Sequence, residues 1–511
     1  MKKNQRKIGA ILSYVSLFVT NIVALIYTPV MLRLMGQSEY GLYSLVASFI
    51  GYLTILDLGF GNAIVVYTAK YKTKNNKKEE EKLHGMFIVI YTIIGILAGI
   101  IGIILYLNIG SLFGAKFTLD ELNKAKIMMG ILTFNLVITF PLSIFGNILT
   151  AYEEFVFSKL VNIVRQLLNP IIMLPLLYIG YKSIAMTVVT TILNILCLLA
   201  NMIFCFKKLK IKIKFNGFDK RILKEIFGYS FFIFLAVIVD KINWQIDQFI
   251  LGSVVGTVAV AIYTVANQIN SVYLSFSTAI SGVLLPKITN MVETNKSNKE
   301  VSDEFIKAGR LQYLLVILVI SGFILFGREF IYLWAGESYE TSYFIACILM
   351  IPVTIPLIQN VGISILQAKN MHRFRTLLYV GISILNIFIS IPLAKMYSGI
   401  GSALGTAFSL ILGNIIIINI YYYKRAKIDI PRFWKNILKM SLPMIVIFLF
   451  GILLNIYIKI NYNWIILFLK ITIYTVIYLI ITYKFSMNIY EKNLFKSVIN
   501  KFKIHKIRIR R

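Results

Sequence analysis

Long apolar runs occupy almost the whole chain and are separated by short polar or basic stretches. Most runs contain about 20 residues, which is the length that an α-helix needs to cross the ~30 Å hydrocarbon layer of a bilayer. The pattern therefore predicts an all-α integral membrane protein with about fourteen transmembrane helices. The predicted spans lie near residues 8–28, 42–66, 86–107, 127–150, 160–180, 183–206, 228–251, 257–285, 310–334, 343–366, 377–395, 400–423, 438–457 and 464–483.

Basic residues are distributed unevenly over the segments between these spans. If the N-terminus is cytoplasmic, about 42 of the 53 lysines and arginines fall in cytoplasmic segments, as the positive-inside rule requires. Omitting one span would invert every later segment and destroy this asymmetry. We therefore expect a multi-pass membrane protein with both termini in the cytoplasm.

Composition agrees with this interpretation and excludes other classes. Hydrophobic residues make up 58% of the 511 residues and charged residues 15%, against roughly 25% charged in soluble domains. The net charge of +31 lies in short segments between spans, so we expect no nucleic-acid partner. Cys197, Cys205 and Cys347 lie in or beside apolar runs without metal-ligand spacing. We expect no metal and no cofactor.

An internal repeat with an offset of about 217 to 220 residues relates the two halves of the chain. The segment LLNPIIMLPLLY at 167–178 matches ILNIFISIPLAK at 384–395, and Gly36 and Tyr43 match Gly256 and Tyr263. Each half contains six spans, and an even number returns the chain to the same side of the membrane. The halves should therefore be parallel repeats.

The repeat predicts four domains. Residues 1–206 form an N-terminal six-helix bundle, 207–227 a basic cytoplasmic linker, and 228–423 a second six-helix bundle. Residues 424–511 add two helices and a basic cytoplasmic tail. Two parallel bundles with substrate between them are typical of transporters that work by alternating access.

Two segments carry a resemblance to a known family. Residues 40–71, YGLYSLVASFIGYLTILDLGFGNAIVVYTAKY, and residues 247–288, DQFILGSVVGTVAVAIYTVANQINSVYLSFSTAISGVLLPKI, resemble the entries to the two halves of bacterial polysaccharide exporters. The resemblance extends over essentially the full chain and includes the O-unit flippase branch. It places the chain in the superfamily of multidrug, oligosaccharidyl-lipid and polysaccharide exporters.

The resemblance implies a V-shaped fold like that of multidrug antiporters of this superfamily. It also implies a function: transfer of undecaprenyl-pyrophosphate-linked oligosaccharide from the cytoplasmic to the outer leaflet of a bacterial inner membrane. The oligosaccharide would serve the synthesis of surface polysaccharides such as the O-antigen of lipopolysaccharide. The implied partners are this lipid carrier, the surrounding membrane lipid, sodium or a proton as coupling ion, and the polymerase and glycosyltransferases of the same process. We expect a monomer.

Ionisable residues at membrane depth are the first candidates for a working site, because they are costly there and usually mark a pathway. In the seventh span Asp240, Trp244 and Asp247 share one helical face, with Lys241 and Gln248 beside it. We expect the two acids to bind a coupling ion and the other three residues to bind substrate. A charge network that only joins helices is the alternative.

Two further spans have polar faces. Asn267, Gln268 and Ser271 fall in one stripe of the eighth span and could bind sugar hydroxyls, or hydrogen-bond to neighbouring helices. In the fifth span Asn162, Arg165, Gln166 and Asn169 share a face. Arg165 could offer its guanidinium to phosphate oxygens, or could neutralise Asp57 in the second span.

Other charged residues near the spans have simpler interpretations. Asp57 lies between glycines and is expected to have a structural role in helix packing. The remaining four lie near predicted membrane interfaces and are expected to extend to water along the surface. They are Arg328, Glu329, Lys395 and Lys470.

Two other functions compete with the flippase. A multidrug or cation antiporter would share the fold and use the same acids, but the cations Lys241 and Arg165 favour an anionic headgroup. A membrane glycosyltransferase or polymerase usually needs a large extracytoplasmic loop, and the largest here is only about residues 108–126. No phosphate-binding GxxxxGK[ST] motif is present, so an ATP-driven pump would need a separate ATPase subunit. We expect a transporter and not an enzyme.

Overall fold

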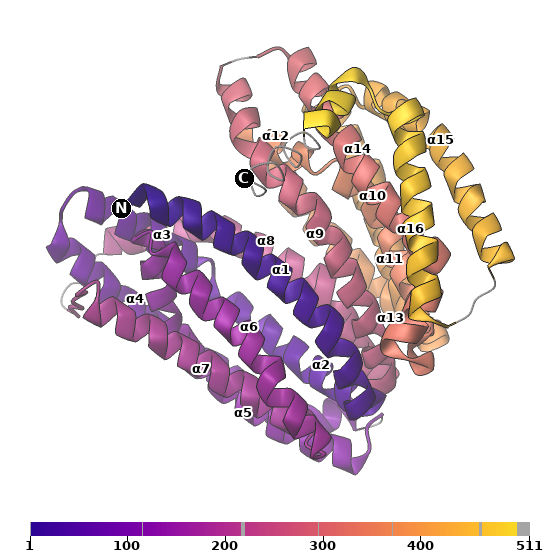
Figure 1. The fold of residues 1–511 in the computed structure, drawn as a ribbon. Coiled ribbons are helices and arrows are strands. Elements are labelled where there is room, and N and C mark those ends of the chain that lie inside the picture. Colours follow the sequence, from indigo (N-terminus) through magenta and orange to yellow (C-terminus); the bar gives the residue numbers. More distant parts are fainter. Residues whose placement is uncertain are drawn as a thin grey trace, which may run out of the picture. The chain divides into compact units, whose positions relative to one another are not determined.

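The computed structural model consists of helices joined by short connections (Figure 1). No β-strand occurs in the part of the chain that it describes, and the predicted all-α class is confirmed. The described residues are 2–114, 116–215, 220–294, 296–369, 371–458 and 462–497.

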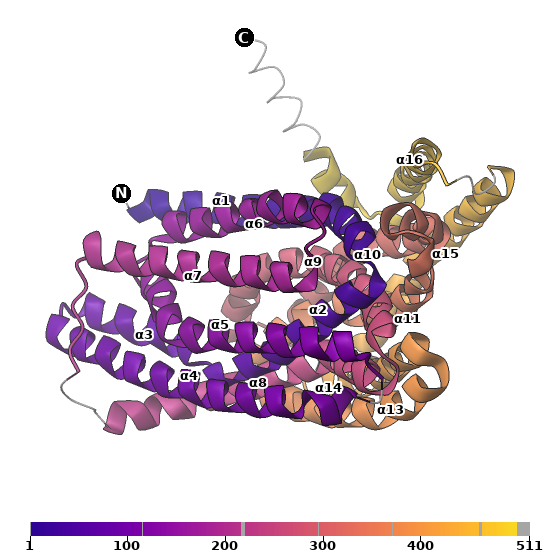
Figure 2. The same cartoon turned by 90° about the horizontal axis from the view of Figure 1, so that it is seen from below.

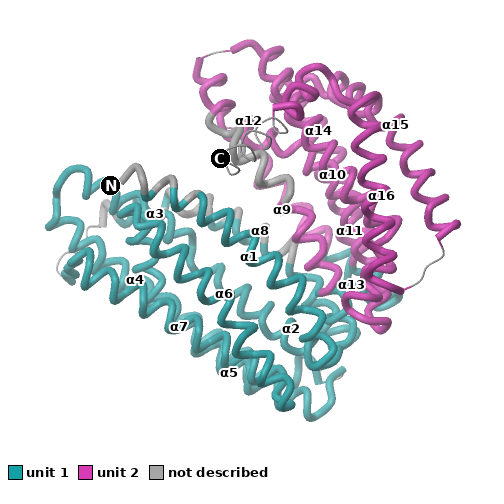
Figure 3. The backbone as a smooth tube through the Cα atoms, in the orientation of Figure 1, with its two compact units in different colours: residues 1–264, 387–402 teal, residues 265–386, 403–511 magenta. Residues whose placement is uncertain are grey.

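Contacts between Cα atoms divide the chain into two compact units (Figure 3). Unit 1 contains residues 1–264 and 387–402, and unit 2 contains residues 265–386 and 403–511. This division follows packing, whereas the predicted domain boundaries follow the sequence repeat. Those boundaries remain a prediction.

Unit 1 contains the helices of the first half of the chain and the start of the second half. Within it α4 packs along α5, α5 along α7, and α1 along α6, as two views show (Figures 1 and 2). Its helices are α1 (Lys2–Met35), α2 (Gln37–Leu53), α3 (Phe60–Thr73), α4 (Lys77–Phe113), α5 (Leu119–Ala151), α6 (Phe155–Tyr178), α7 (Ser183–Lys207), α8 (Lys220–Val254) and the first turns of α9 (Thr257–Glu293).

Unit 2 begins within α9 and contains the remaining helices. Here α10 packs against α11, α15 and α16. The helices are α10 (Asn298–Ala335), α11 (Thr341–Ile358), α12 (Val361–Ala368), α13 (His372–Leu410, of which 387–402 belong to unit 1), α14 (Ile418–Lys424), α15 (Ile430–Tyr457) and α16 (Trp464–Ile481).

The helices account for all fourteen predicted spans. Eleven segments of the described residues are long and apolar enough to cross a membrane, and α8 and α9 correspond to the seventh and eighth predicted spans. One of the eleven, Arg373–Lys424, combines the eleventh and twelfth spans. They are separated where Ser398 adopts a positive φ of 54° inside α13. A left-handed residue interrupts helical geometry, so two spans follow one another there.

Polar side chains mark where several helices begin. Thr118 and Glu121 form a reciprocal capping box at the start of α5, and Ser297 and Glu300 form another at the start of α10. Each box satisfies two backbone N–H groups that the first helical turn leaves unpaired. The local sequence therefore determines these helix starts.

Ser183 and Ser402 correspond in the sequence repeat at an offset of 219 residues, and both donate to a carboxylate, although the two acids do not themselves correspond. Ser183 at the start of α7 and Ser402 after the kink in α13 are both fully buried. The Ser183 hydroxyl donates to the carboxylate of Glu39, and the Ser402 hydroxyl donates to Asp247 Oδ1 at 2.6 Å. Each serine thereby supplies a hydrogen bond that a buried carboxylate requires.

Two buried ion pairs attach the last helix and the segment after it to α10. Lys470 Nζ in α16 lies 2.9 Å from Glu329 Oε2, with exposed fractions of 0% and 3%. Arg310 donates through Nε and Nη2 to both oxygens of Glu491, at 2.7 and 2.9 Å. The expectation that Glu329 and Lys470 extend to water is therefore wrong, because helix packing encloses both side chains and they neutralise each other.

Arg328 and Lys395, which were also expected near a membrane interface, are not buried as Glu329 and Lys470 are. Arg328 is exposed and pairs with Glu340, and Lys395 is exposed. Both therefore lie at a surface, as the sequence suggested.

We predict that Lys470→Met destabilises the protein by about 3–5 kcal/mol, because Glu329 would stay buried without its cation. Thermal or denaturant unfolding in detergent measures this loss. The double variant Lys470→Met with Glu329→Gln should recover most of it, and Lys439→Met on the exposed face of α15 is the control. A Lys470→Met protein as stable as that control would contradict the role of the pair.

Candidate functional site

A break in the second membrane span distinguishes the interior of unit 1. Helix α2 ends at Leu53, and α3 begins only at Phe60. Between them Leu58 and Gly59 have positive φ values of 52° and 75°. Interrupted helices at membrane depth commonly occur at the binding sites of transporters.

Asp57 lies at this break and is hydrogen-bonded within unit 1. Its Oδ1 accepts from the hydroxyl of Tyr91 in α4 at 2.5 Å. A Cβ on nearby Gly61 would lie 3.2 Å from Asn147 Nδ2, so a larger residue would crowd this packing. These contacts agree with the predicted structural role of Asp57.

Arg165 lies at the centre of a polar network that joins three helices of unit 1. Its Nη1 donates to Asn194 Oδ1 in α7 at 3.1 Å. Asn194 Nδ2 in turn donates to Asn135 Oδ1 at 2.9 Å and to Thr139 Oγ1 at 2.8 Å, both in α5. We call Arg165, Asn194, Asn135 and Thr139 the Arg165 network.

The Arg165 network contains no acid. Arg165 is half-buried, and among the described residues its hydrogen-bond partner is a neutral amide and no carboxylate lies within ion-pair distance. The hypothesis that it neutralises Asp57 is wrong, because Asp57 bonds to Tyr91 and Arg165 to Asn194. A guanidinium has five N–H donors, so Arg165 retains capacity for an anion.

Other polar groups on α6 extend the face that carries Arg165. Gln166 Nε2 donates to Ser16 Oγ of α1 at 3.4 Å. Gln166 Oε1 and Asn169 Oδ1 are buried and accept no hydrogen bond from the described residues. Unsatisfied buried polar atoms are rare in native structures and often face a water, an ion or a ligand. The polar stripe predicted for this span is thus present, with unused acceptors beside the cation.

The described acid of the seventh span is enclosed by protein. Asp247 in α8 is 2% exposed, and its two oxygens accept from the hydroxyls of Tyr263 and Ser402, each at 2.6 Å. Gln248 donates to the Thr264 hydroxyl at 3.2 Å. These contacts join α8 to α9 and to the middle of α13 within unit 1.

The other predicted residues of the seventh span are placed only in part. Lys241 is half-buried and interacts with other residues. The side chains of Asp240 and Trp244 lie outside the residues that the structure describes. Their proposed roles stay predictions.

The predicted sugar-binding stripe of the eighth span belongs to unit 2. Asn267 and Gln268 are half-buried and both interact with other groups. Ser271 is exposed, and its hydroxyl donates to the Asn267 carbonyl oxygen at 2.8 Å. This bond lies within one helix, so it does not join α9 to a neighbour.

Three members of the Arg165 network were not among the residues predicted from the sequence. Asn135 and Thr139 are four residues apart and therefore share a face of α5, and Asn194 lies seven residues from both Thr187 and Asn201 on one face of α7. The spacing of Asn135 and Thr139 was a usable signal. Nothing local indicated that Asn194 would contact Arg165.

Comparison with known proteins gives three similarities. A candidate O-antigen transporter of Shigella flexneri is 19% identical over 393 residues, which cover 75% of this chain and 90% of that protein. The fold is similar to the lipid II flippase MurJ in an inward closed conformation, with a TM-score of 0.73, 18% identity and coverage of 93% and 98%. The fold is also similar to an inward-facing multidrug MATE transporter, with a TM-score of 0.63 and 15% identity over 82% of this chain and 95% of that chain.

The structural similarities show that the fold is of the MurJ and MATE type, as the sequence resemblance implied. The family comparison covers more than half of the chain, because residues 7–292 match the polysaccharide biosynthesis protein family. This range contains α1 to α8, the Arg165 network and most of α9. The chain belongs to the polysaccharide biosynthesis protein family.

Proposed function

We propose that the protein is a flippase that moves an undecaprenyl-pyrophosphate-linked oligosaccharide from the cytoplasmic to the outer leaflet of a bacterial inner membrane. The observation that carries this proposal is Arg165, a half-buried guanidinium of a membrane helix whose partner is an amide and not an acid. An intramembrane cation is costly and indicates a function. A phosphate oxygen is the anion that a forked guanidinium fits best.

Polar neighbours make the same face suitable for a glycan headgroup. Gln166 and Asn169 present acceptors that no described residue uses, and sugar hydroxyls are donors. Family membership and the O-antigen transporter relative agree with a saccharide cargo. An antiporter for cationic drugs would instead favour an acid at such a position.

The membrane potential favours export of this substrate. In a cell with a negative interior, each negative charge that moves outward gains about 2.3 kcal/mol per 100 mV. The potential therefore already drives a pyrophosphate with roughly two negative charges outward. What the protein must supply is a lower free-energy barrier for the headgroup in the middle of the membrane. Arg165 and Lys241 would lower this barrier by binding the headgroup during alternating access. Both cations would bind it weakly enough to release it on the outer side.

A cellular experiment tests the transport direction. In cells depleted of this protein, the lipid-linked saccharide should accumulate on the cytoplasmic side, where an impermeant glycosidase added to intact spheroplasts cannot digest it. Restoring the protein should make the saccharide accessible. Digestion that does not depend on the protein would contradict the proposal.

Arg165 should be needed for transport and not for folding. We predict that Arg165→Gln slows flipping about tenfold or more, since a hydrogen bond to a charged group contributes roughly 1.5–3 kcal/mol and ~1.4 kcal/mol is a factor of ten. Arg165→Lys should restore part of the rate, because the charge remains and the fork is lost. Arg328→Gln, at an exposed arginine, is the matched control.

Asn194→Asp is a second test, because it keeps the oxygen that accepts from Arg165 and adds a negative charge beside it. It also removes the Nδ2 donor to Asn135 and Thr139, so the unfolding temperature is measured beside the rate. We predict slower flipping of charged carrier lipid in this variant at normal expression, since the acid would compete with the substrate for the guanidinium. Outer-leaflet appearance of labelled lipid in vesicles measures the rate. Unchanged rates in both Asn194→Asp and Arg165→Gln would refute the role of Arg165.

The acids of α8 are proposed to bind the coupling ion, sodium or a proton. We predict that Asp240→Asn with Asp247→Asn impairs transport more than stability, because an Asn at 247 can still hydrogen-bond to Tyr263 and Ser402. Transport and unfolding temperature are compared with those of Asp303→Asn, an exposed acid of α10. Normal export by the double variant at normal expression would leave these acids with a structural role only.

A further inference from the structure

Unit 1 contains a cavity that the transport proposal does not use. Its volume is about 580 Å³, within the roughly 300–1,000 Å³ that is usual for small-molecule sites. The cavity lies where α6 turns into α7, and the first turns of α2 and α5 complete its wall.

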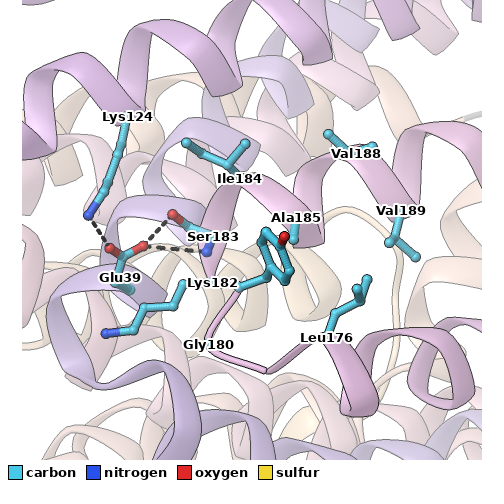
Figure 4. Close-up of a pocket in the computed structure, with 11 residues that line it drawn as sticks. Glu39, Lys124, Leu176, Gly180, Lys182, Ser183, Ile184, Ala185, Val188 and Val189 are labelled. Atoms are coloured by element: carbon cyan, nitrogen blue, oxygen red, sulfur yellow. Dashed lines mark hydrogen bonds and ion pairs between the residues drawn. The ribbon is translucent and has the colours of Figure 1, made fainter. Parts of the chain in front are cut away.

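The cavity has one polar end and one apolar end, as Figure 4 shows. Glu39, Lys124 and Lys182 lie at the polar end, while Leu176, Val188 and Val189 form the other. Such a division suits an amphiphile with a charged head and a hydrocarbon tail. It does not suit a fully polar metabolite.

The polar end has two lysines, and only one of them is held in ion pairs among the described residues. Glu39 accepts from Lys124 Nζ at 2.6 Å and from the Ser183 hydroxyl, so its charge is neutralised. Lys124 also pairs with Asp120 at 2.5 Å. Lys182 is exposed and has no ion pair or hydrogen bond through its amine to any described residue. The amine of Lys182 is therefore available to an anionic headgroup.

The connection beside the cavity has the composition of a membrane interface. Tyr178 is 72% exposed and Tyr181 is 58% exposed, on either side of Gly180. Exposed tyrosines between two spans are typical of the headgroup level of a bilayer. A lipid of the surrounding leaflet can therefore reach the cavity without leaving the membrane.

We propose that this cavity binds one anionic phospholipid of the surrounding leaflet, with an acyl chain along Leu176, Val188 and Val189 and the phosphate at Lys182. The lipid is a bound component of the protein and not the transported substrate. The lysine amine can extend to the phosphate while its methylene groups cover apolar surface. Glu39 of α2 accepts from Lys124 of α5 and from Ser183 of α7 beside the cavity. A lipid bound there therefore stabilises the end of unit 1 where these three helices meet.

Native mass spectrometry of the full-length protein in detergent tests the site by titration with phosphatidylglycerol and with phosphatidylcholine of the same chains. The wild-type protein should bind one phosphatidylglycerol more tightly. Lys182→Gln should raise the Kd for phosphatidylglycerol about fivefold, or about 1 kcal/mol. It should raise the Kd for phosphatidylcholine less, because the choline cation already offsets the charge of that phosphate. Lys116→Gln, an exposed lysine that does not line the cavity, is the matched control.

A second substitution tests the apolar end. Val188→Phe fills the space of the acyl chain and should weaken the binding of both lipids. If size-exclusion chromatography shows that this variant misfolds, Ala185→Leu is used in its place. Equal binding by wild type and Lys182→Gln would overturn the proposal. So would displacement of phosphatidylglycerol by equal concentrations of inorganic phosphate, which lacks a tail. Since no transport is measured, these outcomes are independent of the flippase proposal.

Discussion

A charged side chain inside a bilayer must find its partner within the protein, because neither lipid nor water can supply one there. The fold of this chain depends on that requirement. Asp57 accepts from Tyr91, Asp247 from Tyr263 and Ser402. In each case the partner comes from another helix, so satisfying the charge also positions the helices.

The same requirement separates structural charges from a functional one. The buried pair of Lys470 and Glu329 holds α16 on α10, and each residue neutralises the other. Arg165 has only neutral partners among the described residues, although it lies in the interior of a membrane unit. A protein gains nothing in stability from an unneutralised guanidinium, whereas a carrier of pyrophosphate gains a binding group.

Much of the architecture was predictable from the sequence, because hydropathy and the distribution of basic residues act over whole spans. All fourteen predicted spans correspond to helical segments. The apolar pattern also predicted that the eleventh and twelfth spans are separate, and in the structure Ser398 interrupts the helix between them. The polar face of α6 was likewise visible as residues three and four apart.

Partners between helices were not predictable, because they depend on tertiary packing. Nothing near Lys470 indicates that Glu329, distant in sequence, lies beside it at 2.9 Å. The same is true of Arg165 and Asn194, and of the Glu39 contact with Lys124. The repeat gave a partial signal, since Ser183 and Ser402 occupy corresponding positions and both donate to buried carboxylates.

The central claim is that the protein moves a lipid whose headgroup carries negative charge. Purified protein in vesicles with a set potential, given labelled undecaprenyl-pyrophosphate-linked saccharide, measures this directly. The account predicts flipping that speeds up when the receiving side is positive, and little flipping of the same saccharide on uncharged undecaprenol. Equal rates for the two lipids, independent of the potential, would contradict it.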